Sequence, residues 1–234
     1  MQHLFFFLLL LFATILLSPS CTRCPEMEDP VTSAGPIRFD QLSVGQRSRY
    51  IGLEAENYHS GDGSEFTYSD DTLVLEIVGQ DAQGFKVAET LHYVDSVSNW
   101  HEYDRDSTYL YYLTVIGDTL RLTPVGAPYF RSRLFVYYAS SDGLPLANFG
   151  DMEVAIKGWK TDLPYCECRK TGFTKDYTLF GESYPLLNVL LDNTSMQMDG
   201  PGHTYVYSAE DGVVKFSQYS WWTSTGYGWD LLPE

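Results

Sequence analysis

The sequence predicts an all-β fold, an antiparallel meander that forms either a barrel or a strongly curved open sheet, with little helix beyond an N-terminal signal segment. Three observations support this prediction. Apolar and polar residues alternate along many short segments, as they do in strands with one buried face. Turn signals such as Ser141-Asp142-Gly143 and Asp211-Gly212 separate these segments. The 18 Tyr, 13 Phe and 5 Trp residues also favour strands.

The strands are expected in hairpins. One hairpin is predicted over residues 72–94, with a polar turn from Gly79 to Gly84. A second joins 108–115 to 119–123 through Gly117-Asp118. Further strands are expected at 47–56, 131–139, 152–159, 172–180, 203–208 and 212–219.

Two C-terminal segments are less regular. Residues 183–192 suit either a helix that begins at Ser183-Tyr184-Pro185 or a buried strand, and we favour the strand. The last aromatic segment, Trp229-Asp230-Leu231-Leu232, is expected to seal one end of the sheet.

The N-terminus predicts export. Residues Leu4 to Leu17 are apolar except Thr14, and such a run makes about 21 Å of helix, too short to cross a hydrocarbon core of roughly 30 Å. We therefore assign residues 1–20 to a signal peptide, although Met1-Gln2-His3 contains no Lys or Arg.

The segment Leu17-Ser18-Pro19-Ser20-Cys21 resembles a bacterial lipobox of the relaxed, Bacteroidota type. It departs from the usual pattern, because Ser18 occupies the third position before the cysteine. The resemblance implies that Cys21 is acylated (a palmitate-type lipid) and anchors the protein in the cell envelope, at the periplasmic or surface face of the outer membrane. The alternatives are a signal cleaved without lipidation, which gives a secreted protein, and a retained anchor.

The rest of the chain divides into a tether and a domain. Residues 21–38 hold the lipid-attachment cysteine and a flexible spacer rich in proline and acidic residues. Residues 39–234 are expected to form a single β-meander domain. The chain carries 31 acidic and 15 basic residues, a net charge of −16, which repels nucleic acid and anionic membrane surfaces. The membrane is therefore a partner through the lipid anchor.

Short motifs at both ends of the domain are similar to those of exported β-meander domains. The first is Phe39-Asp40-Gln41-Leu42-Ser43-Val44-Gly45 leading to Tyr50, and the second combines Tyr205-Val206-Tyr207-Ser208 with Gly212-Val213-Val214-Lys215. Overall the chain resembles a Bacteroidota-type lipoprotein of the envelope. This resemblance implies a binding or structural module, since such domains are mostly not enzymes.

Catalytic and metal-binding motifs are not evident, so no catalytic residue, metal or cofactor is expected. Glu54 and Glu56 share one strand face and suit an acid–base pair, but the solubility of an edge strand explains them equally. The oxygen-rich loops 60–65 and 192–200 suit Ca²⁺ or ordinary turns. The histidines His59, His92, His101 and His203 are scattered without ligand spacing.

The cysteines bear on the lipid anchor. If Cys21 is acylated, Cys24, Cys166 and Cys168 remain, which leaves an odd number for disulfides. If Cys21 is a free thiol, two disulfides are possible. Cys166 and Cys168 lie on one strand face, where a direct bridge is strained.

The aromatic C-terminus supplies the candidate ligand site. Exposed aromatic side chains in a concave sheet bind sugars or lipids, although they also fill wide β cores. The candidates are Trp221, Trp222, Tyr227 and Trp229. The function expected is therefore a non-catalytic, lipid-anchored envelope protein that binds a hydrophobic ligand, a glycan or a partner protein. The alternatives are a carboxylate-dependent hydrolase and a structural component of a surface assembly.

Overall fold

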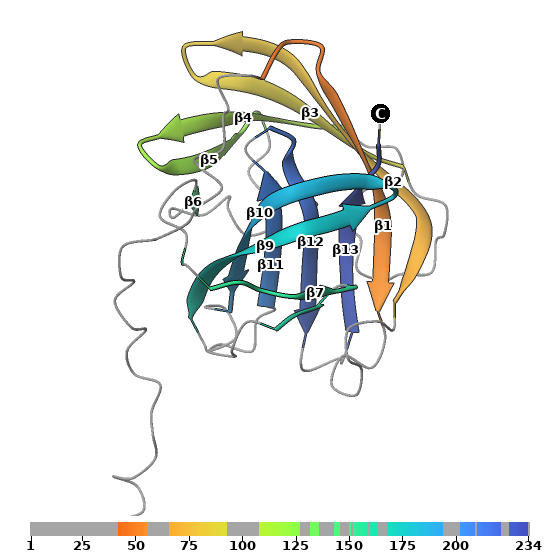
Figure 1. The fold of residues 1–234 in the computed structure, drawn as a ribbon. Coiled ribbons are helices and arrows are strands. Elements are labelled where there is room, and N and C mark those ends of the chain that lie inside the picture. Colours follow the sequence, from red (N-terminus) through yellow and green to blue (C-terminus); the bar gives the residue numbers. More distant parts are fainter. Residues whose placement is uncertain are drawn as a thin grey trace, which may run out of the picture.

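The computed structural model confirms the all-β prediction for the residues that it describes (Figure 1). These residues are 42–55, 66–92, 108–126, 132–135, 143–145, 150, 152–158, 160–162, 168–193, 202–208, 210–220 and 225–233. They form strands and turns, and this part of the chain contains no helix.

The strands follow one another mostly as hairpins. Their bounds are β1 Arg47–Ala55, β2 Thr67–Asp81, β3 Gly84–His92, β4 Thr108–Ile116, β5 Thr119–Pro124, β6 Leu144–Pro145, β7 Ile156–Lys157, β8 Lys160–Thr161, β9 Arg169–Leu179, β10 Glu182–Asp192, β11 Gly202–Ser208, β12 Gly212–Ser220 and β13 Thr225–Leu231.

Eleven of these strands form one open sheet, in the order β6-β5-β4-β3-β2-β1-β13-β12-β11-β10-β9. All of its neighbouring pairs are antiparallel. Because β6 and β9 are edges, the sheet is the curved open form of the two predicted alternatives. Strands β7 and β8 pair separately. The one pair of neighbours in the large sheet that is distant in sequence is β1 with β13, which joins the two halves of the domain.

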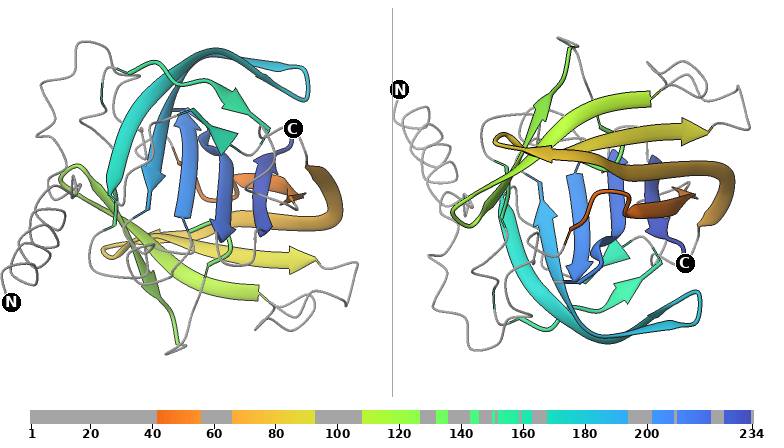
Figure 2. Two further views of the ribbon diagram at one scale, coloured as in Figure 1. Left: turned by 90° about the horizontal axis from the view of Figure 1, so that it is seen from below. Right: turned by 90° about the horizontal axis from the view of Figure 1, so that it is seen from above.

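The sheet curves in opposite directions at its two ends. Figure 2 shows β11, β12 and β13 as a middle wall, with the β9–β10 hairpin over one face and β2 to β5 over the other. This arrangement buries all seven residues of β11, because both faces of that strand are covered. The burial removes the usual alternation of polar and apolar residues from the middle wall.

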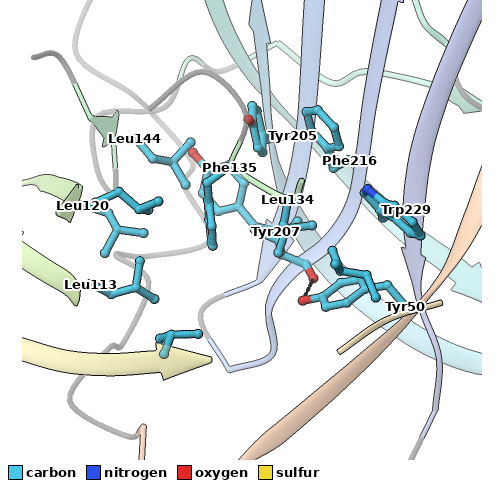
Figure 3. Close-up of a cluster of buried hydrophobic side chains, with 14 of the residues drawn as sticks. Tyr50, Leu113, Leu120, Leu134, Phe135, Leu144, Tyr205, Tyr207, Phe216 and Trp229 are labelled. Atoms are coloured by element: carbon cyan, nitrogen blue, oxygen red, sulfur yellow. Dashed lines mark hydrogen bonds between the residues drawn. The ribbon is translucent and has the colours of Figure 1, made fainter. Parts of the chain in front are cut away.

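The two covered faces hold separate hydrophobic cores. Figure 3 shows part of the first core, in which Leu134 and Phe135 lie between the side chains of β5 and β6 and those of the middle wall. The first core comprises Tyr50, Leu73, Val87, Leu91, Tyr111, Leu113, Leu120, Leu122, Leu134, Phe135, Leu144, Leu190, Tyr205, Tyr207, Val213, Phe216 and Trp229. The second core, on the face that the β9–β10 hairpin covers, comprises Leu53, Ala55, Val154, Leu179, Leu187, Val189, Leu191, Val206, Val214 and Tyr219.

Most predicted strands are confirmed. The two predicted hairpins correspond to β2–β3 and β4–β5, and the segments 47–56, 172–180, 203–208 and 212–219 correspond to β1, β9, β11 and β12. Residues 183–192 lie in β10, so the strand interpretation is correct and the helix is wrong. The second half of β10 is buried and its first half is mostly exposed, as the apolar run in this segment indicated.

Three predictions are corrected. Residues 132–135, inside the predicted strand 131–139, form bends, because the Arg133 amide donates to Glu89 Oε1 and the Phe135 amide donates to Ser132 Oγ instead of to a neighbouring strand. The predicted strand 152–159 reduces to β7 and an isolated bridge between Glu153 and Phe173. The segment from Trp229 does not seal an end of the sheet, since β13 lies between β1 and β12.

A glycine permits the close pairing of β13. An added Cβ at Gly228 would lie 2.2 Å from the Phe216 carbonyl oxygen and 3.2 Å from Leu53 Cδ2. Such a contact is far below van der Waals distance, so only glycine fits between β12 and the second core at this position.

Candidate functional site

An open cleft of about 960 Å³ lies where four segments of the chain meet, and we call it the polar cleft. Its lining comes from the start of β1 and the turn before it, the start of β10, the turn between β11 and β12, and the residues at the end of β13. The lining residues are Gly45–Arg49, Glu182–Leu186, Ser208, Glu210, Asp211 and Leu231–Pro233. Segments from both halves of the domain therefore build the site.

Two arginines supply its positive charge. Arg47 and Arg49 are exposed and share one face of β1, because side chains two residues apart in a strand point the same way. Tyr50, the next residue, is buried on the other face, and its hydroxyl donates to the Val213 carbonyl oxygen at 3.0 Å. Within the described residues neither Arg47 nor Arg49 forms an ion pair. No carboxylate of the described residues therefore competes with a ligand for either guanidinium group in an ion pair.

Carboxylates line other parts of the cleft. Glu182 begins β10, and Glu210 and Asp211 form the turn between β11 and β12. Ser208 fixes this turn, because its hydroxyl donates to Asp211 Oδ2 at 2.8 Å and accepts from the amides of Glu210 and Asp211 at 3.2 and 2.7 Å. A turn held by three such bonds presents its carboxylates in a defined geometry.

An aromatic ring completes the lining. Tyr184 is half-buried in β10, and its ring centroid lies 6.5 Å from that of Tyr177. Burial raises the pKa of the Tyr184 hydroxyl, and the negative charges of Asp211 and Glu182 raise it further. The hydroxyl therefore stays protonated and can donate a hydrogen bond. The cleft combines cationic donors, carboxylate acceptors and one ring surface, a set that suits a polar ligand.

Sequence reasoning missed a buried carboxylate in the first core. Glu89 is 1% exposed and accepts bonds from the Tyr111 hydroxyl at 3.0 Å, the Ser132 hydroxyl at 2.5 Å and the Arg133 amide at 2.6 Å. Burial raises the pKa of Glu89, although these donors and the charge of Arg133 oppose the shift. Its role is to hold residues 132–135 against the sheet. Glu89 lies at every second position with Val87 and Leu91, so the three share one strand face, and this spacing was a signal that Glu89 faces inward.

A second polar cluster also lies beside the first core, on the middle wall. The Tyr227 hydroxyl donates to Gln218 Oε1 at 2.9 Å, and His203 Nε2 lies 3.2 Å from the same oxygen. The His203 ring stacks on Phe216 with 6.2 Å between centroids. Burial lowers the pKa of His203 to about 4, against the charge of Asp192 and the bond to Gln218. The ring is therefore neutral at neutral pH.

Two of the four predicted ligand residues belong to the described part of the chain. Tyr227 and Trp229 lie on β13, but neither is part of the polar cleft. Trp229 is 5% exposed, in the first core, and its Nε1 has no hydrogen-bond partner among the described residues. This burial agrees with the alternative that the aromatic residues fill the core, and a ligand-binding role for them stays a prediction. Trp221, Trp222 and Cys21 lie outside the described residues.

The structure describes only some of the candidate carboxylates, metal-binding loops and cysteines. Glu54 is exposed on β1, whereas Glu56 and the loop 60–65 lie outside the described residues, as does most of 192–200. The described part of the chain contains no group of three or more residues suited to a metal ion. Cys168 is disulfide-bonded, and the other three cysteines lie outside the described residues.

Comparisons with known proteins leave the site to be interpreted from its geometry. The chain matches no protein-family model, no curated protein and no solved structure. None of the described residues forms a helix with the length and apolar character needed to span a bilayer.

Proposed function

We propose that this protein is a non-catalytic binding protein of the cell envelope, anchored by a lipid on Cys21, and that it binds a glycan in the polar cleft. The observation that carries the proposal is the lining of the cleft. It combines Arg47 and Arg49, which form no ion pair with another described residue, with the carboxylates of Glu182, Glu210 and Asp211 and the Tyr184 ring. Sugar hydroxyls both donate and accept hydrogen bonds, so they suit mixed charged donors and acceptors. Because three carboxylates stand against two arginines in the lining, the hydroxyls of a neutral glycan suit the cleft best.

Cavity size favours a glycan over the hydrophobic ligand that the sequence also allowed. An apolar cavity beside the first core, lined by residues such as Leu75, Val87 and Phe135, has a volume of only about 60 Å³. That is the space of roughly two water molecules, far below the size of a lipid chain or a sugar. The polar cleft is large enough for several sugar units.

The location rests on the sequence and on one covalent feature. The apolar run from Leu4 to Leu17 followed by Cys21 supports export and lipidation. The disulfide at Cys168 supports a compartment outside the cytosol, because disulfides persist in oxidising environments. Intact mass measurement of the protein from membranes, beside Cys21→Ala, tests the anchor. Unmodified protein that begins at another residue would refute it.

Binding is tested with the full chain against neutral and acidic oligosaccharides, by calorimetry or a glycan array. We expect Arg47→Ala and Arg49→Ala to weaken binding at least tenfold each, since a bond to a charged group contributes about 1.5–3 kcal/mol. Arg121→Ala is the matched control, because Arg121 is exposed on β5 and does not line the cleft. Equal binding by all three variants would refute the assignment of the cleft.

The hydrolase alternative has a separate test. The purified chain is incubated with chromogenic glycosides and esters, and with any oligosaccharide that it binds. We expect no turnover. Turnover that Glu54→Gln abolishes would replace the binding function with a catalytic one.

A further inference from the structure

A lysine and an aspartate lie in contact on the face of the sheet that holds the second core. Lys215 of β12 and Asp230 of β13 are direct cross-strand partners, and Lys215 Nζ donates to Asp230 Oδ1. Their side chains are 3% and 0% exposed. The hydroxyl of Tyr68 on β2 donates to the other carboxylate oxygen, Oδ2, at 2.9 Å. The ammonium and the carboxylate thus meet in a site shielded from water.

The tip of the β9–β10 hairpin contacts Tyr68, which bonds to the pair. The ring of Phe180, at the tip of the hairpin, lies 5.4 Å from the ring of Tyr68 between centroids. Burial raises the pKa of the Tyr177 hydroxyl on β9, and the negative charge of Asp230 raises it further. The titratable groups that the structure places around the pair are therefore Tyr68 and Tyr177, both neutral hydroxyls.

We propose that Lys215 and Asp230 condense to form an isopeptide bond between Nζ and Cγ, which joins β12 to β13 covalently. The contact holds the lysine nitrogen against an oxygen of the carboxyl group whose carbon it would attack. Reactants fixed side by side in this way react with very high effective concentrations. Residues paired in register on neighbouring strands stay in position throughout the life of the folded protein.

The reaction balances without a further reagent. Burial lowers the pKa of Lys215, although Asp230 opposes this shift, and a proton passes from the ammonium to the carboxylate along the existing bond. The neutral amine attacks Cγ, and the Tyr68 hydroxyl stabilises the negative charge that develops on Oδ2. The carbon–oxygen bond then breaks, the second amine proton joins the departing hydroxide, and one water leaves.

Burial also favours the product over the ion pair. Two charges in a dry interior carry a large desolvation cost, whereas the neutral amide that replaces them carries a much smaller one. Water is both the product of condensation and the reagent of hydrolysis, so the burial of both side chains protects the bond once it has formed.

The sequence allows a direct test by peptide mapping of the full chain. After Lys175 the chain contains a single lysine, Lys215, and no arginine. Trypsin acting on the denatured protein would release residues 216–234 from an unlinked chain. It cannot cleave after an acylated lysine, so the linked chain gives one fragment of residues 176–234 that is lighter by about 18 Da, the mass of one water.

Two variants control the digest. Lys215→Arg keeps the charge and the cleavage site but has no amine to condense, so it must release residues 216–234 at full mass. Asp230→Ala removes the electrophile and must do the same. Tyr68→Phe should slow linkage, which appears as a mixture of the two digests. Stoichiometric release of residues 216–234 from the wild-type protein would overturn the proposal, and this measurement does not depend on whether any variant folds.

Discussion

His203 should make the protein lose stability in mild acid. Its ring is buried beside Phe216 and bonded to Gln218, and its pKa is lowered from the ordinary value of 6.5 to about 4. Above pH 6.5 the histidine is neutral in both the folded and the unfolded chain, so it contributes no pH dependence there. As the pH falls below 6.5, the unfolded chain binds the proton first, and folding becomes less favourable.

The size of the loss follows from the two pKa values. Each unit between them is worth about 1.36 kcal/mol, so the full contribution approaches 3 kcal/mol near pH 4 and is about 2 kcal/mol at pH 5. A loss of this size is a large part of the stability of a typical domain, about 5–15 kcal/mol.

The assay is urea unfolding at pH 7.5, 6, 5 and 4.5, followed by tyrosine and tryptophan fluorescence. His203→Gln removes the titrating ring but keeps a polar side chain for Gln218, and the wild-type-minus-variant difference isolates the contribution of His203. Other groups, such as Glu89 with its raised pKa and opposite sign, cancel in this difference. His92→Gln, at the exposed end of β3, is the matched histidine-to-glutamine control.

One result would show that the His203 ring is not buried in solution. If the free-energy difference between wild type and His203→Gln stays constant from pH 7.5 to 4.5, the ring titrates alike in the folded and unfolded chains. Its burial beside Phe216 would then not be maintained in solution.

Three further outcomes follow from the packing. Ser132→Ala should lower the free energy of unfolding by about 1.5–3 kcal/mol at pH 7, because it removes a bond to the buried carboxylate of Glu89. Denaturant titration measures this free energy, and an unchanged value would contradict the role of that bond. Gly228→Ala should destabilise by about 1–3 kcal/mol, since its Cβ would meet the backbone of β12, whereas the control Gly79→Ala has 3.9 Å of space. Trp229→Phe should cost less than about 1.5 kcal/mol, because the lost indole N–H has no partner among the described residues, while Trp229→Ala should cost about 3–5 kcal/mol in the same titration.

Local patterns predicted the hairpins well. Leu73, Leu75 and Ile77 recur at every second position, and a glycine-containing turn follows them. This pattern carries enough information to define β2 and β3, because both strands and their connection are adjacent in sequence. The same holds for β4–β5 and for β11–β12. Strand β10 was harder, since its inner half is buried on both sides and shows no alternation.

Contacts between distant segments could not be read from the sequence. Nothing local in Trp229-Asp230-Leu231 shows that β13 pairs with β1, so its central place in the sheet was missed. The bends at residues 132–135 depend on Glu89, more than forty residues earlier in the chain. The polar cleft was missed for the same reason, because Arg47, Glu182 and Asp211 come together only through the β1–β13 pairing.

The pairing of β1 with β13 also sets the order in which the protein can be completed. One edge of β1 pairs with β2 almost as soon as both are made, but its other edge waits for β13, more than 160 residues later, to emerge. Until then the growing or newly exported chain presents an unpaired strand edge, the kind of surface that recruits other chains and promotes aggregation. Loss of β13 alone would therefore open the sheet between β1 and β12, and each of these strands would then present an unpaired edge.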